Sequence, residues 1–172
     1  GATLAFGIGN AWSSTREWHE RRDFYPEGVA SGDPYADSVL LWTRRPPLDS
    51  DAATRLTVEV AEDEKFTRVV ATASAKLTAA SDWTCRILAA GLKPAKVYWY
   101  RFTDEHGNGS RVGRTITAPA NTDARSVRFA FVSCQDANTG AQNACRRMIY
   151  EDERAPEADR LGFVLHLGDF IY

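Results

Sequence analysis

The chain has 172 residues, of which 44% are hydrophobic and 26% are charged, and its formal net charge is -2. A chain of this length forms one domain, or one domain and part of another, and its apolar content is sufficient for a packed core. The small net charge and the lack of a basic run give no reason to expect specific nucleic-acid recognition, and no apolar stretch is long enough to span a membrane.

The first 23 residues are interpreted as a leader and lead-in segment. Gly1 to Ala11 are small and apolar and resemble the end of the hydrophobic region of a signal peptide, with a small-x-small cleavage site at Gly9-Asn10-Ala11. The charged region that opens a signal peptide is absent, so a clipped leader and a disordered terminus stand as equal alternatives. Trp12 to Asp23 show no clear period and are interpreted as the lead-in.

Residues 24–119 show the pattern of a β-sandwich. Apolar residues alternate with polar ones in several short runs, and turn residues separate the runs. This period of two is typical of antiparallel strands with one face on a core, and many short strands of this kind predict a two-layer antiparallel sandwich. Strands are expected at Ser38–Thr43, Leu56–Val60, Trp83–Ile87 and Tyr98–Phe102.

Three features of this region have structural interpretations. Leu92-Lys93-Pro94 followed by Tyr98 resembles the tyrosine corner of fibronectin type III-like domains, in which the hydroxyl bonds back to the backbone. Trp42 is predicted to be a core residue, because buried aromatic side chains dominate such cores. Gly32-Asp33-Pro34 has the chemistry of a turn, and a contact between Asp33 and a catalytic domain is the alternative.

Residues 120–126 are a candidate linker, since they are small and polar and show no apolar period. Residues 127–172 then begin a second domain. Two buried-strand patterns, in Phe129–Gln135 and Phe163–Gly168, flank a helical pattern that Thr139 with Gln142 starts as a capping box. The apolar residues with helical spacing are Ala141, Ala144, Cys145, Met148 and Ile149.

Strand, helix and strand in this order predict a right-handed βαβ unit with parallel strands. The carboxyl ends of parallel strands lie at one edge of the sheet, where α/β proteins bind their ligands. Cys134 follows the first strand and Asp169 follows the second. We therefore expect these two side chains to face a common crevice.

The residues at this edge are candidate metal ligands. Asp169 and Tyr172 offer hard oxygen donors that one tight turn can aim at the same point, whereas the thiolate of Cys134 suits iron better than calcium or magnesium. Other interpretations remain open: Cys134 as a small buried hydrophobe, Asp169 as a turn residue, and Tyr172 as a side chain without a ligand role. His166 lies within the strand and is interpreted as a hydrogen-bonded core histidine.

The motifs FAFVSCQ (129–135) and VLHLGDFIY (164–172) resemble the start of the catalytic domain of PhoD-like alkaline phosphatases/phosphodiesterases, in the metallophosphoesterase class. GVASGDPYADSVLLWTR (28–44) resembles the N-terminal domain of the same family. The resemblance covers about residues 24–172, with the motifs in the expected order. It implies a fibronectin type III-like antiparallel β-sandwich, followed by the first βαβ unit of a truncated α/β metallophosphoesterase domain.

The resemblance also implies an exported enzyme that holds Fe3+ and Ca2+ and hydrolyses phosphomonoesters or phosphodiesters with a metal-activated hydroxide. In it, Cys134 is an iron ligand, Asp169 bridges iron and calcium, and Tyr172 is the iron-bound phenolate. The family's other ligands and phosphate contacts lie downstream of Tyr172, so we expect this chain alone to be inactive.

Two expectations stand beside the enzyme hypothesis. A non-catalytic β-sandwich interaction module is the alternative function, and clustered Asp, Asn and His residues beyond Tyr172 would distinguish the two. Cys85 and Cys145 fall in different predicted domains, so free thiols are the default, although an exported protein allows these two cysteines to pair.

Overall fold

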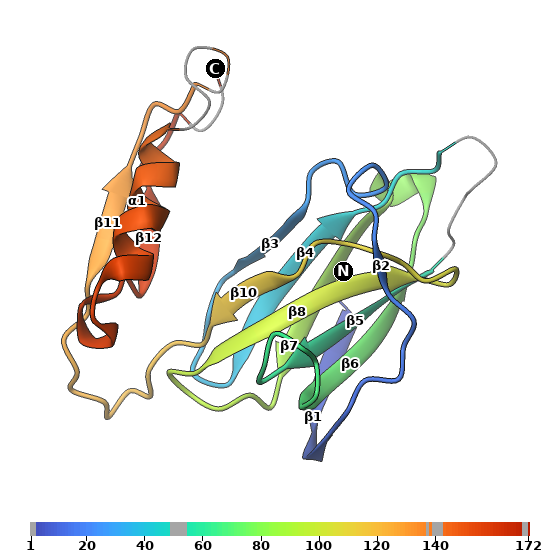
Figure 1. Cartoon of the computed structure of the whole chain (residues 1–172), viewed down its shortest axis with the longest axis horizontal. Coiled ribbons are helices and arrows are strands. Elements are labelled where there is room, and N and C mark those ends of the chain that lie inside the picture. Colours follow the sequence, from blue (N-terminus) through green and yellow to red (C-terminus); the bar gives the residue numbers. More distant parts are fainter. Residues whose placement is uncertain (1–2, 49–54, 137, 139–142, 170–171) are drawn as a thin grey trace. The chain divides into compact units, whose positions relative to one another are not determined.

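The computed structural model describes residues 3–48, 55–136, 138, 143–169 and 172. It divides into two compact units, a sandwich unit (Gly1–Asp123) and a βαβ unit (Ala124–Tyr172), each of which is described by itself (Figure 1). The division between Asp123 and Ala124 falls inside the segment 120–126 for which a linker was predicted.

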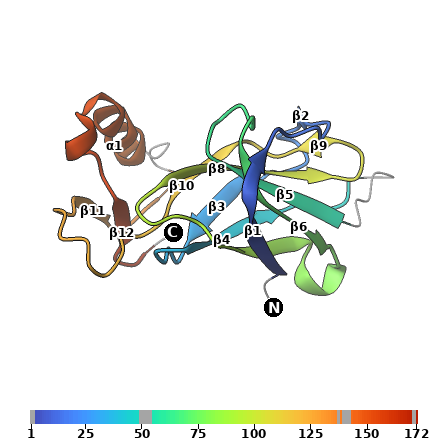
Figure 2. The same cartoon turned by 90° about the horizontal axis from the view of Figure 1, so that it is seen from below.

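The described residues of the sandwich unit form one ten-stranded sheet in the order β2-β9-β8-β5-β6-β1-β7-β4-β3, with β10 paired to β8 (Figures 1 and 2). A short 3-10 helix, Ala79–Ser81, precedes β7. All sheet pairings are antiparallel except β1 with β7 and β2 with β9. The strands are β1 (Thr3–Trp12), β2 (His19–Glu20), β3 (Val29–Gly32), β4 (Ser38–Arg44), β5 (Arg55–Ala61), β6 (Val69–Lys76), β7 (Thr84–Ala90), β8 (Val97–Asp104), β9 (Asn108–Gly109) and β10 (Gly113–Ile116).

The core of this unit follows from the period-two pattern. Alternate residues of β4, β5, β7 and β8 turn inward and form one buried apolar cluster. The predicted strands are all present, and their predicted inward residues in β5 and β8 are buried, so the mainly β architecture is confirmed. Large side chains in this cluster that are at most 2% exposed include Leu41, Leu56, Val58, Val60, Ile87, Tyr98, Tyr100 and Phe102.

Trp42 does not belong to this core, so its prediction was wrong. On β4 the inward residues are Val39, Leu41 and Thr43, which are at most 1% exposed. Trp42 is half-buried on the opposite face, where Ala30 and Arg86 are its register partners. Both faces of β4 carry apolar residues, and the alternation alone does not say which face turns inward.

The hydroxyl of Tyr98 makes the contact that the tyrosine corner predicts. Tyr98 is 1% exposed, and its Oη accepts a hydrogen bond from the backbone N–H of Lys93 at 2.8 Å. The contact ties the loop before β8 to the core of the sandwich. Tyr98 is therefore a structural residue, as expected.

Strand β1 lies in the middle of the sheet. Its first half pairs in parallel with β7, and its second half pairs antiparallel with β6. It therefore joins the two layers of the sandwich, of which one contains β3, β4 and β7 and the other contains β2, β5, β6, β8, β9 and β10. From Thr3 onward, the segment for which a clipped leader or a disordered terminus was expected therefore has a regular place in the fold. A cleavage after Ala11 would remove most of this strand.

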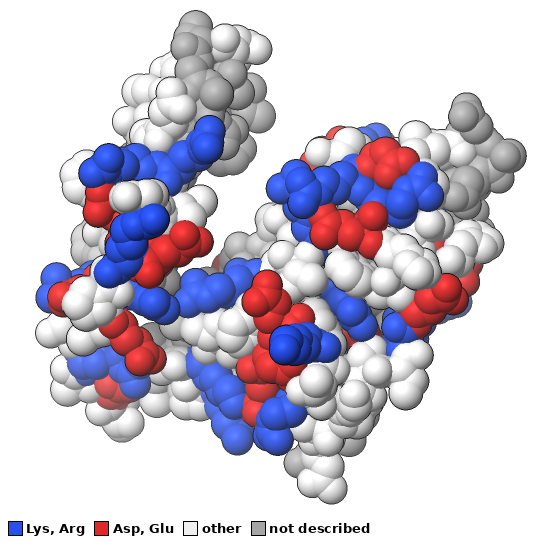
Figure 3. All heavy atoms as spheres, viewed as in Figure 1, with Lys and Arg blue, Asp and Glu red and all other residues white. Residues whose placement is uncertain are grey.

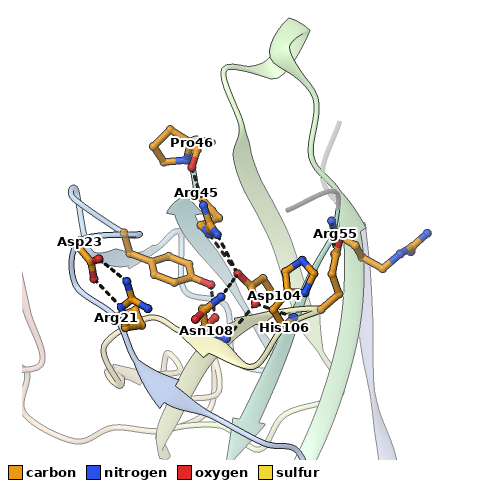
Figure 4. A network of polar contacts seen from close by, with 10 residues as sticks. Arg21, Asp23, Arg45, Pro46, Arg55, Asp104, His106 and Asn108 are labelled. Carbon is orange, nitrogen blue, oxygen red and sulfur yellow. Dashed lines mark hydrogen bonds and ion pairs between the residues drawn. The ribbon is translucent and has the colours of Figure 1, made fainter. Parts of the chain in front are cut away.

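A buried ion pair, which the sequence did not indicate, fixes one end of the sandwich (Figure 4). Arg45 donates to Asp104 Oδ2 at 3.1 Å, and both side chains are 0% exposed. The other carboxylate oxygen of Asp104 accepts two backbone N–H groups of the β8–β9 turn at 2.9 Å. The Phe24 ring lies 4.1 Å from the Arg45 guanidinium and 4.0 Å from that of Arg21, so the ion pair also anchors the chain before β3.

The βαβ unit has the predicted order of elements. The parallel strands β11 (Phe129–Val132) and β12 (Phe163–His166) are joined through helix α1 (Asn143–Arg154) and a short 3-10 helix, Glu157–Asp159. The proposed capping box at Thr139 and Gln142, together with Ala141, lies outside the described residues. Figure 1 shows α1 running along one side of the two strands.

The odd-numbered side chains of β11 and β12 are exposed, and so is Val164 on the other side of β12, at 46%. Phe129 and Phe163 are register partners, and their rings stack with centroids 5.3 Å apart. They are 51% and 43% exposed, and Phe131 and Leu165 beside them are 68% and 44% exposed. We call these four residues the aromatic face, since they leave one side of the strand pair apolar and open to solvent.

Candidate metal centre

The loops that follow β11 and β12 are joined by backbone hydrogen bonds beyond the ends of the strands. Leu167 N–H donates to Val132 O at 2.8 Å, Cys134 N–H donates to Gly168 O at 3.2 Å, and Gln135 N–H donates to Asp169 O at 2.8 Å. These bonds continue the parallel pairing through the polar residues that the sequence singled out. Cys134 and Asp169 therefore lie opposite each other at the carboxyl edge of the sheet.

Both residues have a left-handed backbone. The φ angle is 58° at Cys134 and 53° at Asp169, and Gly168, which directly precedes Asp169, has a φ of 119°. This region costs a non-glycine residue on the order of 1 kcal/mol or more, and such strain concentrates at functional sites, where the surrounding hydrogen bonds maintain it. With these backbone angles the two side chains lie within hydrogen-bonding distance of each other.

The side chains of Cys134, Asp169 and Tyr172 make direct polar contacts. The thiol of Cys134 donates to Asp169 Oδ2, with Sγ and Oδ2 separated by 3.4 Å. The Tyr172 hydroxyl lies close enough to the Asp169 carboxylate for each group to shift the pKa of the other. The contact with Tyr172, then that with Cys134, and to a smaller extent the charge of His166, lower the pKa of Asp169.

The same contacts act in the opposite direction on Tyr172. The proximity of Asp169, followed by that of Cys134, raises the pKa of Tyr172 to about 12. Without a cation, the phenol thus keeps its proton and shares it with the carboxylate. All three side chains are exposed to solvent, and Tyr172 is 61% exposed, so an ion can reach them from bulk water.

A thiol, a carboxylate and a phenol in mutual contact fit a cation that accepts both sulfur and oxygen ligands, such as iron. Among the described residues there is no group of three or more His, Cys, Asp and Glu side chains that could hold a metal ion. The oxygen of Tyr172 is therefore needed to make a three-donor set, and a metal with four to six ligands needs further donors.

A small pocket adjoins this cluster. It has a volume of about 240 Å3 and lies between the end of β11 and the start of α1, where Ser133, Cys134, Gln135, Asn143 and Cys145 contribute to its lining. Polar groups beside a candidate metal ligand are suited to contact the oxygen atoms of a bound substrate.

A larger pocket of about 490 Å3 lies in the sandwich unit. Its carboxylates have structural partners: Glu59 accepts from Arg101 and from Ser14, and Asp104 pairs with Arg45. We therefore place the candidate site at Cys134, Asp169 and Tyr172. On the face shown in Figure 3, acidic and basic residues are intermixed, without a broad area of one sign.

The structure brings the three predicted ligands together, and it gives the hydrogen bond expected of His166 a partner that the sequence did not indicate. His166 ends β12, and its Nδ1 accepts a hydrogen bond from the backbone N–H of Gly168 at 3.4 Å. The proximity of a histidine to a Gly-Asp turn was visible in the sequence. The direction of the His166 ring was not visible, because it depends on the local backbone conformation.

Comparison with known proteins identifies the family. Residues 10–119 match the family described as PhoD-like phosphatase, N-terminal domain. The chain belongs to the PhoD-like phosphatase family. The match begins before Trp12, so this N-terminal domain includes the segment 12–23 that was interpreted as a lead-in.

Two PhoD proteins extend the similarity into the βαβ unit. Alkaline phosphatase D of Bacillus subtilis (strain 168) is 40% identical over an alignment of 152 residues, and the match covers 84% of this chain and 24% of that protein. A solved structure of PhoD aligns with a TM-score of 0.73 and 36% identity, over 94% of this chain and 30% of that one. The chain thus spans about a quarter of the length of its curated PhoD relative. None of its described helices is long and apolar enough to cross a membrane.

Proposed function

We propose that this chain is the N-terminal portion of an exported, metal-dependent phosphodiesterase or alkaline phosphatase. The observation that carries the proposal is the hydrogen bond from Cys134 to the Asp169 carboxylate at the carboxyl edge of the parallel strands, with the Tyr172 hydroxyl near enough to the same carboxylate to shift its pKa. The 40% identity to alkaline phosphatase D extends over 84% of this chain. Phosphomonoesters and phosphodiesters are the proposed substrates.

In this proposal Cys134 and Tyr172 would hold iron, and Asp169 would be shared between iron and calcium. Bound cations neutralise the charge of a phosphoester and lower the pKa of bound water, so that hydroxide is available near neutral pH. The residues of this chain hold the ligand atoms in place. The backbone hydrogen bonds from Cys134 and Gln135 fix the Gly168–Asp169 turn, and release of the thiol and phenol protons accompanies binding of the cation.

The test uses a longer protein that contains this chain and continues past Tyr172. Bound metal is measured by elemental analysis, and the visible absorption spectrum is recorded. We expect iron and a tyrosinate charge-transfer band that disappears in Tyr172→Phe. Tyr35→Phe is a matched control, because Tyr35 has the same exposed fraction, 61%, and lies in the sandwich unit.

A Cys134→Ser variant is expected to lose iron, because an alcohol is a much poorer iron ligand than a thiolate. A band that persists in Tyr172→Phe would remove Tyr172 from the ligand set and leave it as a hydrogen-bond partner of Asp169. An active but iron-free protein would show that the ligand assignment is wrong as a whole. Recovery of the protein from the culture medium or the cell envelope tests its export.

The 172-residue chain by itself is predicted to show little or no turnover. Three donors leave a multinuclear site incomplete, so no ion is held firmly enough to activate water. The measurement is hydrolysis of a phosphodiester and of a phosphomonoester, with and without a chelator. Robust hydrolysis that the chelator abolishes would contradict this prediction.

A further inference from the structure

The Gly168 residue is held from both sides. Its N–H donates to His166 Nδ1 at 3.4 Å, and its C=O accepts from the N–H of Cys134 at 3.2 Å. The N–H and the C=O of one residue belong to two successive peptide planes. Fixing both planes fixes the φ and ψ angles between them, and it does so one residue before Asp169.

The imidazole is suited to this task. Val132 is the register partner of His166, and the other ring nitrogen, Nε2, is buried, so the ring cannot rotate freely into solvent. The neighbouring Leu167 N–H is used by the strand pairing, whereas the Gly168 N–H turns out of the ladder. Nδ1 supplies the acceptor for this N–H when the ring carries its proton on Nε2.

The conformation held in this way cannot be adopted cheaply by most residues. Gly168 has a φ of 119°, in the region that favours glycine, and a Cβ added there would meet no atom within 4 Å. The glycine is therefore required by the backbone angle and not by space. A change of this angle redirects the Asp169 side chain, because Asp169 follows directly in the chain.

We propose that His166 is a positioning residue, whose Nδ1 holds the Gly168 amide and thereby aims the Asp169 carboxylate at Cys134 and Tyr172. The consequence for metal binding rests on the proposed function. The positioning itself can be measured without a metal. A ring that only fills space would act through its volume, whereas a positioning ring acts through the acceptor at Nδ1.

Two substitutions separate these roles. The Oδ1 of an asparagine side chain occupies nearly the place of Nδ1, so His166→Asn keeps the acceptor while it removes volume. His166→Leu keeps much of the volume and removes the acceptor. His19→Leu is the control, since His19 is an exposed histidine of the sandwich unit. Gly168→Ala tests the same arrangement by disfavouring the positive φ angle of residue 168 while His166 is kept.

The first measurement is hydrogen exchange at single-residue resolution, on the longer protein after removal of metal with a chelator. We expect the Gly168 amide to exchange at least about 10-fold faster in His166→Leu than in the unaltered protein, and to keep its protection in His166→Asn and His19→Leu. Unchanged protection in His166→Leu would overturn the proposal.

The second measurement is iron affinity, for which loss of an outer contact of a ligand weakens binding by about 10–100-fold. We expect this loss in His166→Leu and Gly168→Ala, near-normal affinity in His166→Asn, and a fall in kcat without a comparable rise in KM. Equal losses in the Asn and Leu variants would assign His166 a space-filling role. An unaltered protein without iron or hydrolysis refutes the proposed function, and the exchange measurement still decides the role of His166.

Discussion

Tyr98 shows how a single hydroxyl group supports the sandwich. The N–H of Lys93 has Tyr98 Oη as its acceptor at 2.8 Å, and the Tyr98 side chain is almost completely buried. In Tyr98→Phe this N–H loses its partner, which lowers the free energy of unfolding by about 1–3 kcal/mol. Denaturant titration measures the difference. Tyr35→Phe, at an exposed position, is expected to change nothing, and equal stability of both variants would contradict the role of the corner.

Glu62 provides a prediction on pH. Its side chain is 13% exposed and pairs first with Lys96 and then with Arg68, and these contacts lower the pKa of Glu62 below its ordinary value of 4.5. A carboxylate with a lowered pKa in the folded state stabilises the protein above pH 4.5, and this contribution is lost as the pH falls through the lowered pKa. Stability therefore rises with pH across this window.

Glu62→Gln is expected to reduce the free energy of unfolding by about 0.5–1 kcal/mol at pH 7, the range of a partly exposed ion pair. At a pH below both pKa values the two proteins should be equally stable, because Glu62 is then protonated as well. Urea titration at both pH values measures this. A difference of the same size at both would show that the pairing does not stabilise the fold through charge.

At the scale of the elements, a glycine decides how the lead-in segment packs on the sheet. A Cβ added at Gly109 of β9 would lie 1.9 Å from Trp18 Nε1, which donates to Ser110 O at 3.2 Å. Gly109→Ala displaces the indole and costs about 1–3 kcal/mol. Gly32→Ala is the control, since a Cβ there meets no atom within 4 Å. Denaturant titration with tryptophan fluorescence follows both the stability and the indole, and an undisturbed indole in Gly109→Ala would contradict the packing.

Local periodicity was sufficient to predict most elements. The alternation at Leu56, Val58 and Val60 has one apolar phase, so both the strand and its inward face were correct. The prediction that Trp42 is a core residue failed because β4 carries apolar residues on both faces. The Arg45–Asp104 pair joins positions 59 residues apart, and no local pattern indicates such a partner.

For the candidate site too, the sequence predicted which elements come together but not the individual contacts between distant residues. The order of strand, helix and strand was enough to bring Cys134 and Asp169 to one edge. The left-handed backbone at both residues and the His166–Gly168 contact depend on hydrogen bonds between two loops, which a single sequence does not reveal.

At the scale of the whole molecule, the two units differ in how completely they bury their apolar residues. The sandwich unit encloses its cluster between two layers. In the βαβ unit, described helix α1 contains no buried residue, and the aromatic face of β11 and β12 is exposed. Parallel strands normally have both faces covered, so we expect this unit to be the less stable of the two.

The aromatic face leads to the last prediction, which concerns association. Phe129, Phe131, Phe163 and Leu165 are each at least 43% exposed, and contiguous apolar surface of this kind binds hydrophobic dyes and drives self-association at micromolar to millimolar concentrations. We expect the 172-residue chain to bind such a dye and to associate with rising concentration. Phe131→Glu should weaken both effects, because association would bury a charge.

Tyr35→Glu is the matched control, since Tyr35 is 61% exposed, close to the 68% of Phe131, but lies in the sandwich unit. Light scattering over a concentration series measures association, and dye fluorescence reports the exposed face. A chain that stays monomeric and binds no dye, or a Tyr35→Glu variant as effective as Phe131→Glu, would show that the aromatic face does not drive association.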